Sequence, residues 1–384
     1  MHDRTRYDAI VIGGGIVGVS TAYALVRGGA RVLLVDRADP GRATDAGAGI
    51  LSPETSFRYP PSWFAFAKEA VRYYPALLED LRTDRAEETG YARCGLLVVA
   101  SSEDERPAFE RARAEICARQ EERGLPFQDV VREISAGDAR RLFPPLGEVV
   151  GAISYRDAAR VDGRLLATAI RLAAERWGLA IVRGSVDRLL LAGGRAAGAV
   201  LAGDTLSAPR VVITGGAWSA AFEAQLGIQI PVTPQRGQII HLGVGGTETA
   251  EWTIILGFRD HYMVPWPQGR VVVGATRETG SGFDPRPTAA GVREVLAEAL
   301  RVAPGLAEAE VLEIRVGLRP LSSDGLPVLG EVPGAPGVYL ATGHGPTGLQ
   351  LGPYSGKVVA DLMLGREPEV DLAPFRPERF QERG

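Results

Sequence analysis

The chain has 384 residues, of which 45% are hydrophobic and 23% charged, and its formal net charge is -4. These values are typical of a globular protein with a large core, and the length exceeds that of one ordinary domain. The balanced charge argues against a nucleic-acid partner, and no run of about twenty apolar residues exists to span a membrane. Two cysteines, Cys94 and Cys117, fit neither a disulfide framework nor a metal or redox spacing, so we expect a cytoplasmic protein without a metal site.

The first element expected is a strand from Asp8 to Ile12, which leads into Gly13-Gly14-Gly15-Ile16-Val17-Gly18 and a helix. A second strand follows and ends at Asp36. In this order the spaced glycines permit a tight turn, a close approach to a pyrophosphate and close packing of helix on strand. The start of the helix offers unpaired N–H groups to the phosphates. The sequence therefore predicts a site for NAD or FAD; the competing interpretation is a glycine-rich turn without a ligand.

The next predicted elements are mostly helical. Residues 41–51 are too small and flexible for a regular element and can lie against a ligand. A helix is expected from Trp63 to Arg82, interrupted near Pro75 because proline lacks an N–H and clashes with the preceding turn. A strand over 95–100 precedes a charged helix that ends before Gly124, and a further helix runs from Asp162 to Gly178.

The second half of the chain is expected to be rich in strands. The predicted strands cover residues 180–182, 186–191, 199–201, 210–214, 237–242, 252–256, 261–264, 270–275 and 337–342. A hairpin turn is expected at Gly193-Gly194, one helix over 289–302, and a final glycine loop and helix that end near Leu364.

These elements predict an α/β protein with a Rossmann-like FAD-binding domain and an inserted, mostly antiparallel β-sheet substrate domain. The cofactor domain is assigned to residues 1–85, 155–225 and 320–384, and the substrate domain to residues 86–154 and 226–319. NAD dehydrogenases usually complete their sheet from contiguous βαβ units, so this interrupted arrangement favours FAD.

Several separated segments together resemble the family of D-amino acid oxidase, glycine oxidase and sarcosine oxidase, with glycine oxidase nearest. Besides the N-terminal fingerprint and residues 44–51, they are 211–219, Arg236-Gly237-Gln238, 262–265, 269–276, Gly317-Leu318-Arg319-Pro320, 324–327 and 342–345. The resemblance covers almost the whole chain. It implies a D-amino acid oxidase-like two-domain architecture, non-covalent FAD, and oxidation of the C–N bond of a small amino or imino acid to the imine by hydride transfer to flavin N5.

The fingerprint and the resemblance together indicate a set of cofactor-binding residues. Asp36 is expected to bind the adenosine ribose, and the helix that begins around Thr347 to stabilise negative charge on the flavin. The full set is Gly13, Gly15, Ile16, Val17, Gly18, Asp36, Arg37, Thr44, Asp45, Gly49, Ile50, Leu51, Val186, Thr214, Gly215, Trp218, Arg319, Gly343, Gly345, Thr347, Gly348, Leu349 and Gln350.

Three residues are the candidates for the catalytic site. The resemblance implies that Tyr262 and Arg319 bind the substrate carboxylate, for which a planar guanidinium offers a matching fork of donors. The competing interpretations are a structural ion pair for Arg319 and a core aromatic for Tyr262. His344 is placed beside the flavin, either as a base or as a hydrogen-bonding support of its loop. The chemistry itself requires no obligatory general base.

The chain departs from glycine oxidase at Pro346, where that enzyme carries a second substrate-binding arginine. Carboxylate recognition then depends on Arg319 and Tyr262, with His344 or Arg236 as possible assistants. The segment from His344 to Leu349 is more similar to D-amino acid and hydroxyproline dehydrogenases. The substrate (glycine, sarcosine, a D-amino acid or a proline-like imino acid) and the acceptor, O2 or a quinone, therefore stay open.

Three alternatives to a self-sufficient oxidase remain. They are a dehydrogenase with an acceptor other than O2, a flavoprotein subunit of a hetero-oligomer, and a non-catalytic dinucleotide-binding regulator. A homo-oligomer is equally compatible with the sequence. The aromatic residues Phe57, Tyr59, Trp63 and Phe64 either line the substrate entrance or pack in the core.

Overall fold

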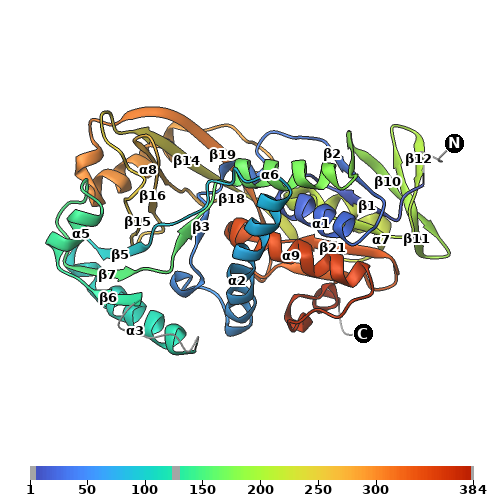
Figure 1. The fold of residues 1–384 in the computed structure, drawn as a ribbon, viewed down its shortest axis with the longest axis horizontal. Coiled ribbons are helices and arrows are strands. Elements are labelled where there is room, and N and C mark those ends of the chain that lie inside the picture. Colours follow the sequence, from blue (N-terminus) through green and yellow to red (C-terminus); the bar gives the residue numbers. More distant parts are fainter. Residues whose placement is uncertain (1–5, 123–129, 382–384) are drawn as a thin grey trace.

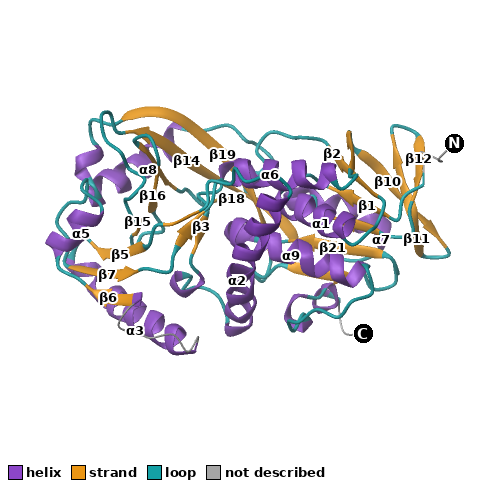
Figure 2. Ribbon diagram, viewed as in Figure 1, coloured by secondary structure: helices purple, strands orange, loops and turns teal. Residues whose placement is uncertain are grey.

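In the computed structural model, which describes residues 6–122 and 130–381, the chain forms two regions that lie side by side along the long axis (Figure 1). One region contains a parallel sheet covered by helices, and the other a large, mostly antiparallel sheet (Figure 2). This confirms the expected fold class. The boundaries between the two domains stay a prediction.

The parallel region is organised around a six-stranded sheet of order β20-β21-β13-β1-β2-β9. All neighbouring strands are parallel except β20, which runs antiparallel to β21. The carboxyl ends of the parallel strands therefore meet at one edge, where ligands bind in open α/β sheets. The strands are β1 (Ala9–Ile12), β2 (Val32–Asp36), β9 (Ala180–Arg183), β13 (Val211–Ile213), β20 (Val328–Glu331) and β21 (Val338–Thr342).

Both faces of this sheet are buried. Val11 and Leu34 point into the core under helices α1, α2, α6 and α9, whereas Ile10 and Leu33 point into a second core under a three-stranded antiparallel sheet. Burial on both faces explains why the strands are continuous apolar runs. The covering elements are α1 (Ile16–Arg27), α2 (Pro61–Thr83), α6 (Gly163–Arg176), α9 (Gly348–Met363), β10 (Val186–Ala192), β11 (Arg195–Leu201) and β12 (Asp204–Ser207).

The second region contains a nine-stranded sheet of order β18-β14-β17-β16-β15-β5-β7-β6, with β19 paired to β14. Its pairs are antiparallel except that of β5 with β15. Phe109 of α3 packs on one face, and Phe143, together with Val295 of α8, on the other. The sheet and its helices are β5 (Leu96–Ala100), β6 (Val131–Glu133), β7 (Gly151–Tyr155), β14 (Val232–Gly243), β15 (Ile254–Leu256), β16 (Tyr262–Trp266), β17 (Arg270–Gly274), β18 (Glu278–Thr279), β19 (Glu310–Ser322), α3 (Arg106–Glu122), α5 (Ala136–Leu142) and α8 (Ala289–Val302).

Short elements complete the fold. A small sheet of order β3-β8-β4 lies between the two regions, and a short helix follows β13. Within the described residues, no helix is long and apolar enough to cross a membrane. These elements are β3 (Ile50–Leu51), β4 (Ala92–Arg93), β8 (Ala159–Arg160) and α7 (Glu223–Leu226).

Most predicted elements are present. The Gly193-Gly194 turn joins β10 to β11, and the Asp162 side chain caps α6 by accepting hydrogen bonds from the N–H groups of Arg164 and Leu165. Gly124, where the charged helix was predicted to end, lies outside the described residues. The long strand β19 had not been resolved as an element in the sequence.

The predicted interruption near Pro75 is wrong, because α2 continues through this residue. Pro75 is exposed, whereas its neighbour Tyr74 is buried and donates a hydrogen bond to the carbonyl of Leu349. Phe66, also on α2, packs against Tyr354 of α9 with ring centroids 5.3 Å apart. This packing against α9 compensates for the backbone hydrogen bond that proline cannot donate.

Strands β14 and β19 connect the two regions. Their ladder extends from Val232 opposite Ser322 to Gly243 opposite Glu310. Near its end β19 is held on both sides, since the Leu318 N–H donates to the Gly41 carbonyl over 2.8 Å and Leu321 forms a β-bridge with His344. Residues 318–321 are therefore fixed between two loops of the parallel region.

Candidate active site

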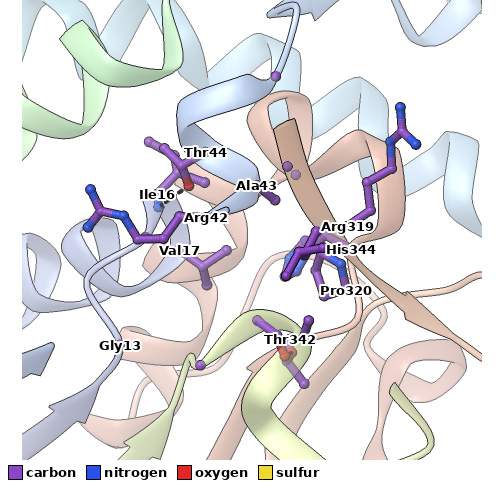
Figure 3. A pocket seen from close by; sticks show the side chains of 18 of the residues that line it. Gly13, Ile16, Val17, Arg42, Ala43, Thr44, Arg319, Pro320, Thr342 and His344 are labelled. Atoms are coloured by element: carbon purple, nitrogen blue, oxygen red, sulfur yellow. Dashed lines mark hydrogen bonds between the residues drawn. The ribbon is translucent and has the colours of Figure 1, made fainter. Parts of the chain in front are cut away.

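A cavity of about 280 Å³ lies where the parallel sheet meets β14 and β19. Its lining extends from Asp36, at the end of β2, to Tyr262 on β16 and Arg319 on β19. Figure 3 shows the glycine loop with Arg42 and Thr44 on one side and Arg319, Pro320 and His344 on the other. The cavity therefore joins the predicted dinucleotide site to the predicted substrate site.

Most of the residues predicted to bind the cofactor line this cavity. They are Gly13, Gly15, Ile16, Val17, Asp36, Arg37, Thr44, Gly49, Ile50, Val186, Thr214, Gly215, Trp218, Arg319, Gly345, Gly348, Leu349 and Gln350. Tyr262 and His344 also line it. Five residues of the predicted set are outside the lining: Gly18, Asp45, Leu51, Gly343 and Thr347.

The glycine loop has the geometry that a pyrophosphate requires. Gly13 has a φ of +113°, and a Cβ added there would lie 2.6 Å from the Thr214 carbonyl oxygen. A Cβ at Gly18 would lie 1.8 Å from the Gly13 carbonyl oxygen, so Gly18 is needed for packing of the loop on α1. The N-cap residue Gly15 has no side chain to cap α1, and the Ile16 N–H instead donates to Thr44 Oγ1 over 3.0 Å. The start of α1, with its partial positive charge, fits an anionic group.

A pair of opposite charges lies beside this loop. The Asp36 carboxylate accepts a hydrogen bond from Arg42 Nη1 over 3.0 Å, and Arg42 Nε donates to Asp45 over 3.1 Å. A Cβ at Gly14 would lie 2.8 Å from the Asp36 carboxylate, so the glycine allows Asp36 to rest against the loop. Arg42 was not predicted. This arginine lies within the segment 41–51, from which Thr44, Asp45, Gly49, Ile50 and Leu51 were the predicted cofactor-binding residues.

His344 supports the last glycine loop. It is buried, and its Nε2 lies 2.9 Å from Ser355 Oγ of α9. Burial lowers the pKa of His344 to about 4, so the ring is neutral at neutral pH. The Thr347 hydroxyl donates to the His344 carbonyl over 2.8 Å and therefore does not cap α9. These contacts agree with a structural role for His344 and leave the first N–H groups of α9 free of a side-chain cap.

Arg319 and Tyr262 form the opposite end of the cavity. Arg319 Nη1 donates to the Thr276 carbonyl over 2.8 Å, and no carboxylate of a described residue lies within ion-pairing distance of this guanidinium. A Cβ at Gly237 would lie 2.5 Å from Cζ and both terminal nitrogens, so the planar group lies flat over this glycine. Burial raises the pKa of Tyr262, and the charge of Arg319 opposes this shift. The end of the cavity thus holds an unneutralised guanidinium beside a neutral phenol.

Arg236, considered as an assistant in carboxylate binding, is engaged elsewhere. Its Nη2 lies 2.6 Å from Glu278 and its Nη1 3.3 Å from Asp284, and it does not line the cavity. Instead Arg277 and Asp260 do, and neither was predicted. The sequence pointed to Arg277 only through its position directly after residues 269–276, one of the segments that carry the family resemblance.

The aromatic residues considered for the substrate entrance pack in the protein. Trp63 and Phe64 are buried in the core under the helices, and Tyr59 stacks on Trp63 with ring centroids 4.2 Å apart. None of them, nor Phe57, lines the cavity. Among the described residues, no cluster of three or more His, Cys, Asp or Glu side chains is arranged to hold a metal ion.

Comparison with known proteins identifies the family of the chain. The family model described as DAO, FAD dependent oxidoreductase, matches residues 8–362, so the chain belongs to this family of FAD-dependent oxidoreductases. It is an enzyme class that includes the amino acid oxidases.

Individual relatives match over nearly their whole length. The uncharacterized oxidoreductase YurR of Bacillus subtilis (strain 168) is 39% identical, with 96% of this chain and 98% of the relative covered. Glycine oxidase of Pseudomonas aeruginosa is 32% identical with the same coverage of both chains. The crystal structure of iminodiacetate oxidase (IdaA) from Chelativorans sp. BNC1 is similar with a TM-score of 0.91 and 42% identity, over 96% of this chain and 98% of that one.

Proposed function

We propose that this protein oxidises the C–N bond of a small amino or imino acid to the imine, with non-covalently bound FAD as the hydride acceptor. The observation that carries the proposal is the single cavity that connects a pyrophosphate-type glycine loop to the paired Arg319 and Tyr262. The similarity to glycine oxidase and to iminodiacetate oxidase supports an amino or imino acid as the substrate. Cys94 and Cys117 do not line the cavity, which supports non-covalent binding.

The chain offers a partner for each part of the cofactor. We assign the pyrophosphate to the glycine loop and the start of α1, and the adenosine ribose to Asp36. Arg42 and Thr44 border the same loop and would act beside them. The start of α9 would face the flavin, where its unpaired N–H groups favour negative charge.

Catalysis then depends mainly on placement. Bound FAD supplies a ring that takes a hydride from the substrate carbon. The guanidinium of Arg319 and the phenol of Tyr262 would hold the substrate carboxylate and so fix the position of the adjacent Cα. His344 is neutral and bonded to Ser355, so it would hold the loop and the start of α9 in place without transferring a proton.

We also propose the domain division given by the sequence. All six strands of the parallel sheet fall within residues 1–85, 155–225 and 320–384. The boundary at residue 320 would place Arg319 at the junction, on the strand that both regions share.

The decisive test is anaerobic mixing of the purified protein with glycine, sarcosine, proline and the D- and L-amino acids, with flavin absorbance as the readout. Bleaching by an amino or imino acid is expected. Arg319→Met removes two charge-assisted hydrogen bonds of about 1.5–3 kcal/mol each, so kcat/KM should fall roughly 10²- to 10⁴-fold. Flavin content should persist in this variant. Unchanged kinetics would remove Arg319 as the carboxylate anchor.

The electron acceptor and the assembly need separate measurements. Peroxide formation under air by the isolated chain would identify an oxidase. Rapid anaerobic flavin reduction followed by slow reoxidation in air, but fast reoxidation by a quinone, would identify a dehydrogenase. Bound flavin that no amine reduces until a partner subunit is added would identify a subunit of a hetero-oligomer.

A further inference from the structure

The substrate end of the cavity contains a second guanidinium, that of Arg277. Its side chain is 38% exposed and lines the same cavity as Arg319 and Tyr262. Arg277 directly follows Thr276, whose carbonyl holds the Arg319 guanidinium. The two arginines are close enough that the charge of Arg277 adds to burial in lowering the pKa of Arg319. Two like charges are therefore directed at one small volume.

The protein does not neutralise this charge. Among the described residues, Asp260 is the one acid that pairs with Arg277, and its Oδ2 lies 3.7 Å from Arg277 Nε. The other oxygen of Asp260 is already engaged, at 2.5 Å from Nη2 of Arg58. Arg58 and Arg277 thus share a single carboxylate, and Arg319 has none within ion-pairing distance among the described residues, so the three guanidiniums carry an excess of two positive charges. One substrate carboxylate on Arg319 would remove only half of it.

The second arginine is also not needed to hold the fold. A long contact between half-exposed groups contributes little to stability, with a typical value of about 0–1 kcal/mol. In contrast, Arg236 on the neighbouring strand is largely buried and paired at 2.6 Å, as expected of a structural arginine. Arg277 has the exposure, the free donors and the position of a ligand-binding residue.

We propose that the substrate is a dicarboxylic amino or imino acid, with its first carboxylate on Arg319 and Tyr262 and its second on Arg277. This inference rests on the function proposed above and specifies its substrate class. The second carboxylate belongs either to the other arm of an imino diacid or to the side chain of an acidic amino acid. Hydride leaves Cα, a proton leaves nitrogen, the C=N bond forms and FAD takes the two electrons. Water then hydrolyses the imine to an oxo acid, with release of a primary amine from an imino diacid and of ammonia from an acidic amino acid.

Matched substrate pairs test the inference. Iminodiacetate and sarcosine differ only by the second carboxylate. Aspartate and alanine differ in the same way, and both enantiomers of these two amino acids are tested. The rate of anaerobic flavin reduction and the dissociation constant are measured by stopped flow with the FAD-loaded protein. For one of the pairs, the dicarboxylate should exceed the monocarboxylate in reduction efficiency by about tenfold or more, and the pair that does so identifies where the second carboxylate lies.

Variants then assign the preference to Arg277. Arg277→Met should lower the dicarboxylate-to-monocarboxylate ratio by roughly 10- to 100-fold, mainly through the dissociation constant, and Arg277→Lys should restore part of it. Arg58→Met is the matched control, because Arg58 contacts the same Asp260 but does not line the cavity, and it should leave the ratio unchanged. Flavin content and thermal unfolding check that each variant is folded.

The outcomes separate the two proposals. If no amine reduces the flavin, the proposed function fails. If monocarboxylates reduce it and dicarboxylates have no advantage, the function stands and the role of Arg277 is refuted. A dicarboxylate preference that survives unchanged in Arg277→Met and Arg277→Lys would likewise refute it.

Discussion

Replacing Gly237 by alanine tests whether catalysis depends on the orientation of the Arg319 guanidinium. Gly237 lies on β14 opposite Gly317 of β19, and its backbone has a conformation that alanine adopts without strain. The substitution therefore adds one methyl group and leaves the backbone conformation unchanged. That methyl would meet Cζ, Nη1 and Nη2 of Arg319 at 2.5 Å each.

The expected magnitude follows from this geometry. Ordinary carbon contacts begin near 3.4 Å, so the guanidinium must move by about 0.9 Å, the difference between 3.4 and 2.5 Å. Such a shift breaks the fit to the Thr276 carbonyl, which Arg319 contacts at 2.8 Å. A misplacement of about 1 Å in a binding group costs roughly 10²-fold in rate, so kcat/KM for a carboxylate substrate should fall by about this factor.

Anaerobic flavin reduction over a range of substrate concentrations measures the effect. The loss should appear in the limiting rate of flavin reduction as well as in the dissociation constant, while the flavin spectrum and flavin content stay those of the unaltered protein. Gly245→Ala is the control, because no atom lies within 4 Å of the added Cβ, and it should behave as the unaltered protein. If Gly237→Ala reduces its flavin as efficiently as the control, the flat placement of Arg319 over Gly237 has no part in substrate binding.

Three other perturbations test the cofactor loop and the stability of the fold. Gly18→Ala places a Cβ 1.8 Å from the Gly13 carbonyl oxygen, so FAD affinity should fall. The loss should be roughly 10- to 100-fold by flavin titration, and full flavin occupancy would contradict the packing role. Pro75→Ala restores a backbone donor on the exposed face of α2 and should stabilise the protein by about 1–3 kcal/mol in thermal or urea unfolding; a lower Tm would contradict this. Burial lowers the pKa of His241 from 6.5 to about 4, so the unfolded chain binds a proton that the folded one does not, and stability is lost as the pH falls from 6.5 to 4. Between pH 7 and pH 5 the free energy of unfolding in urea should fall by about 2 kcal/mol less in His241→Gln than in the unaltered protein. If the two proteins lose stability equally over this range, the assignment to His241 is refuted.

The cofactor half of the site was largely predictable because its signals are local. A strand, a glycine-spaced turn and a helix are adjacent in the chain, and Gly13, Ile16 and Asp36 follow from their order alone. The error at Pro75 has a non-local cause. Whether proline breaks a helix depends on the packing around it, here the contact of Tyr74 with Leu349, 275 positions further along the chain.

The substrate half was only partly predictable, since its residues are brought together by pairing between distant strands. Arg319 was assigned from a resemblance, but the strand that positions it was not recognised. β19 has exposed Val311 and Leu312 at one end and Pro320 at the other, and it forms its ladder with β14 alone. Residues 313–319 of β19 do alternate polar or small residues with apolar ones, but Gly317 and Pro320 are residue types that strands disfavour. Its anchoring by Gly41 and His344 involves loops that no periodicity reveals.

The choice between Arg236 and Arg277 shows most clearly what the sequence lacks. Both arginines occur in recognised segments or next to them, and both have the same chemistry. The register of β14 with β18 places Arg236 opposite Glu278, and this pairing neutralises Arg236. Successive side chains of an extended chain point to opposite sides, so the same register that directs Glu278 toward Arg236 directs the preceding residue, Arg277, into the cavity. A shift of one residue in this short pairing would instead place Arg277 or Thr279 opposite Arg236. The surroundings of Arg277, to which we assign the second carboxylate, therefore depend on the pairing of a strand of two residues, which composition and motifs do not predict.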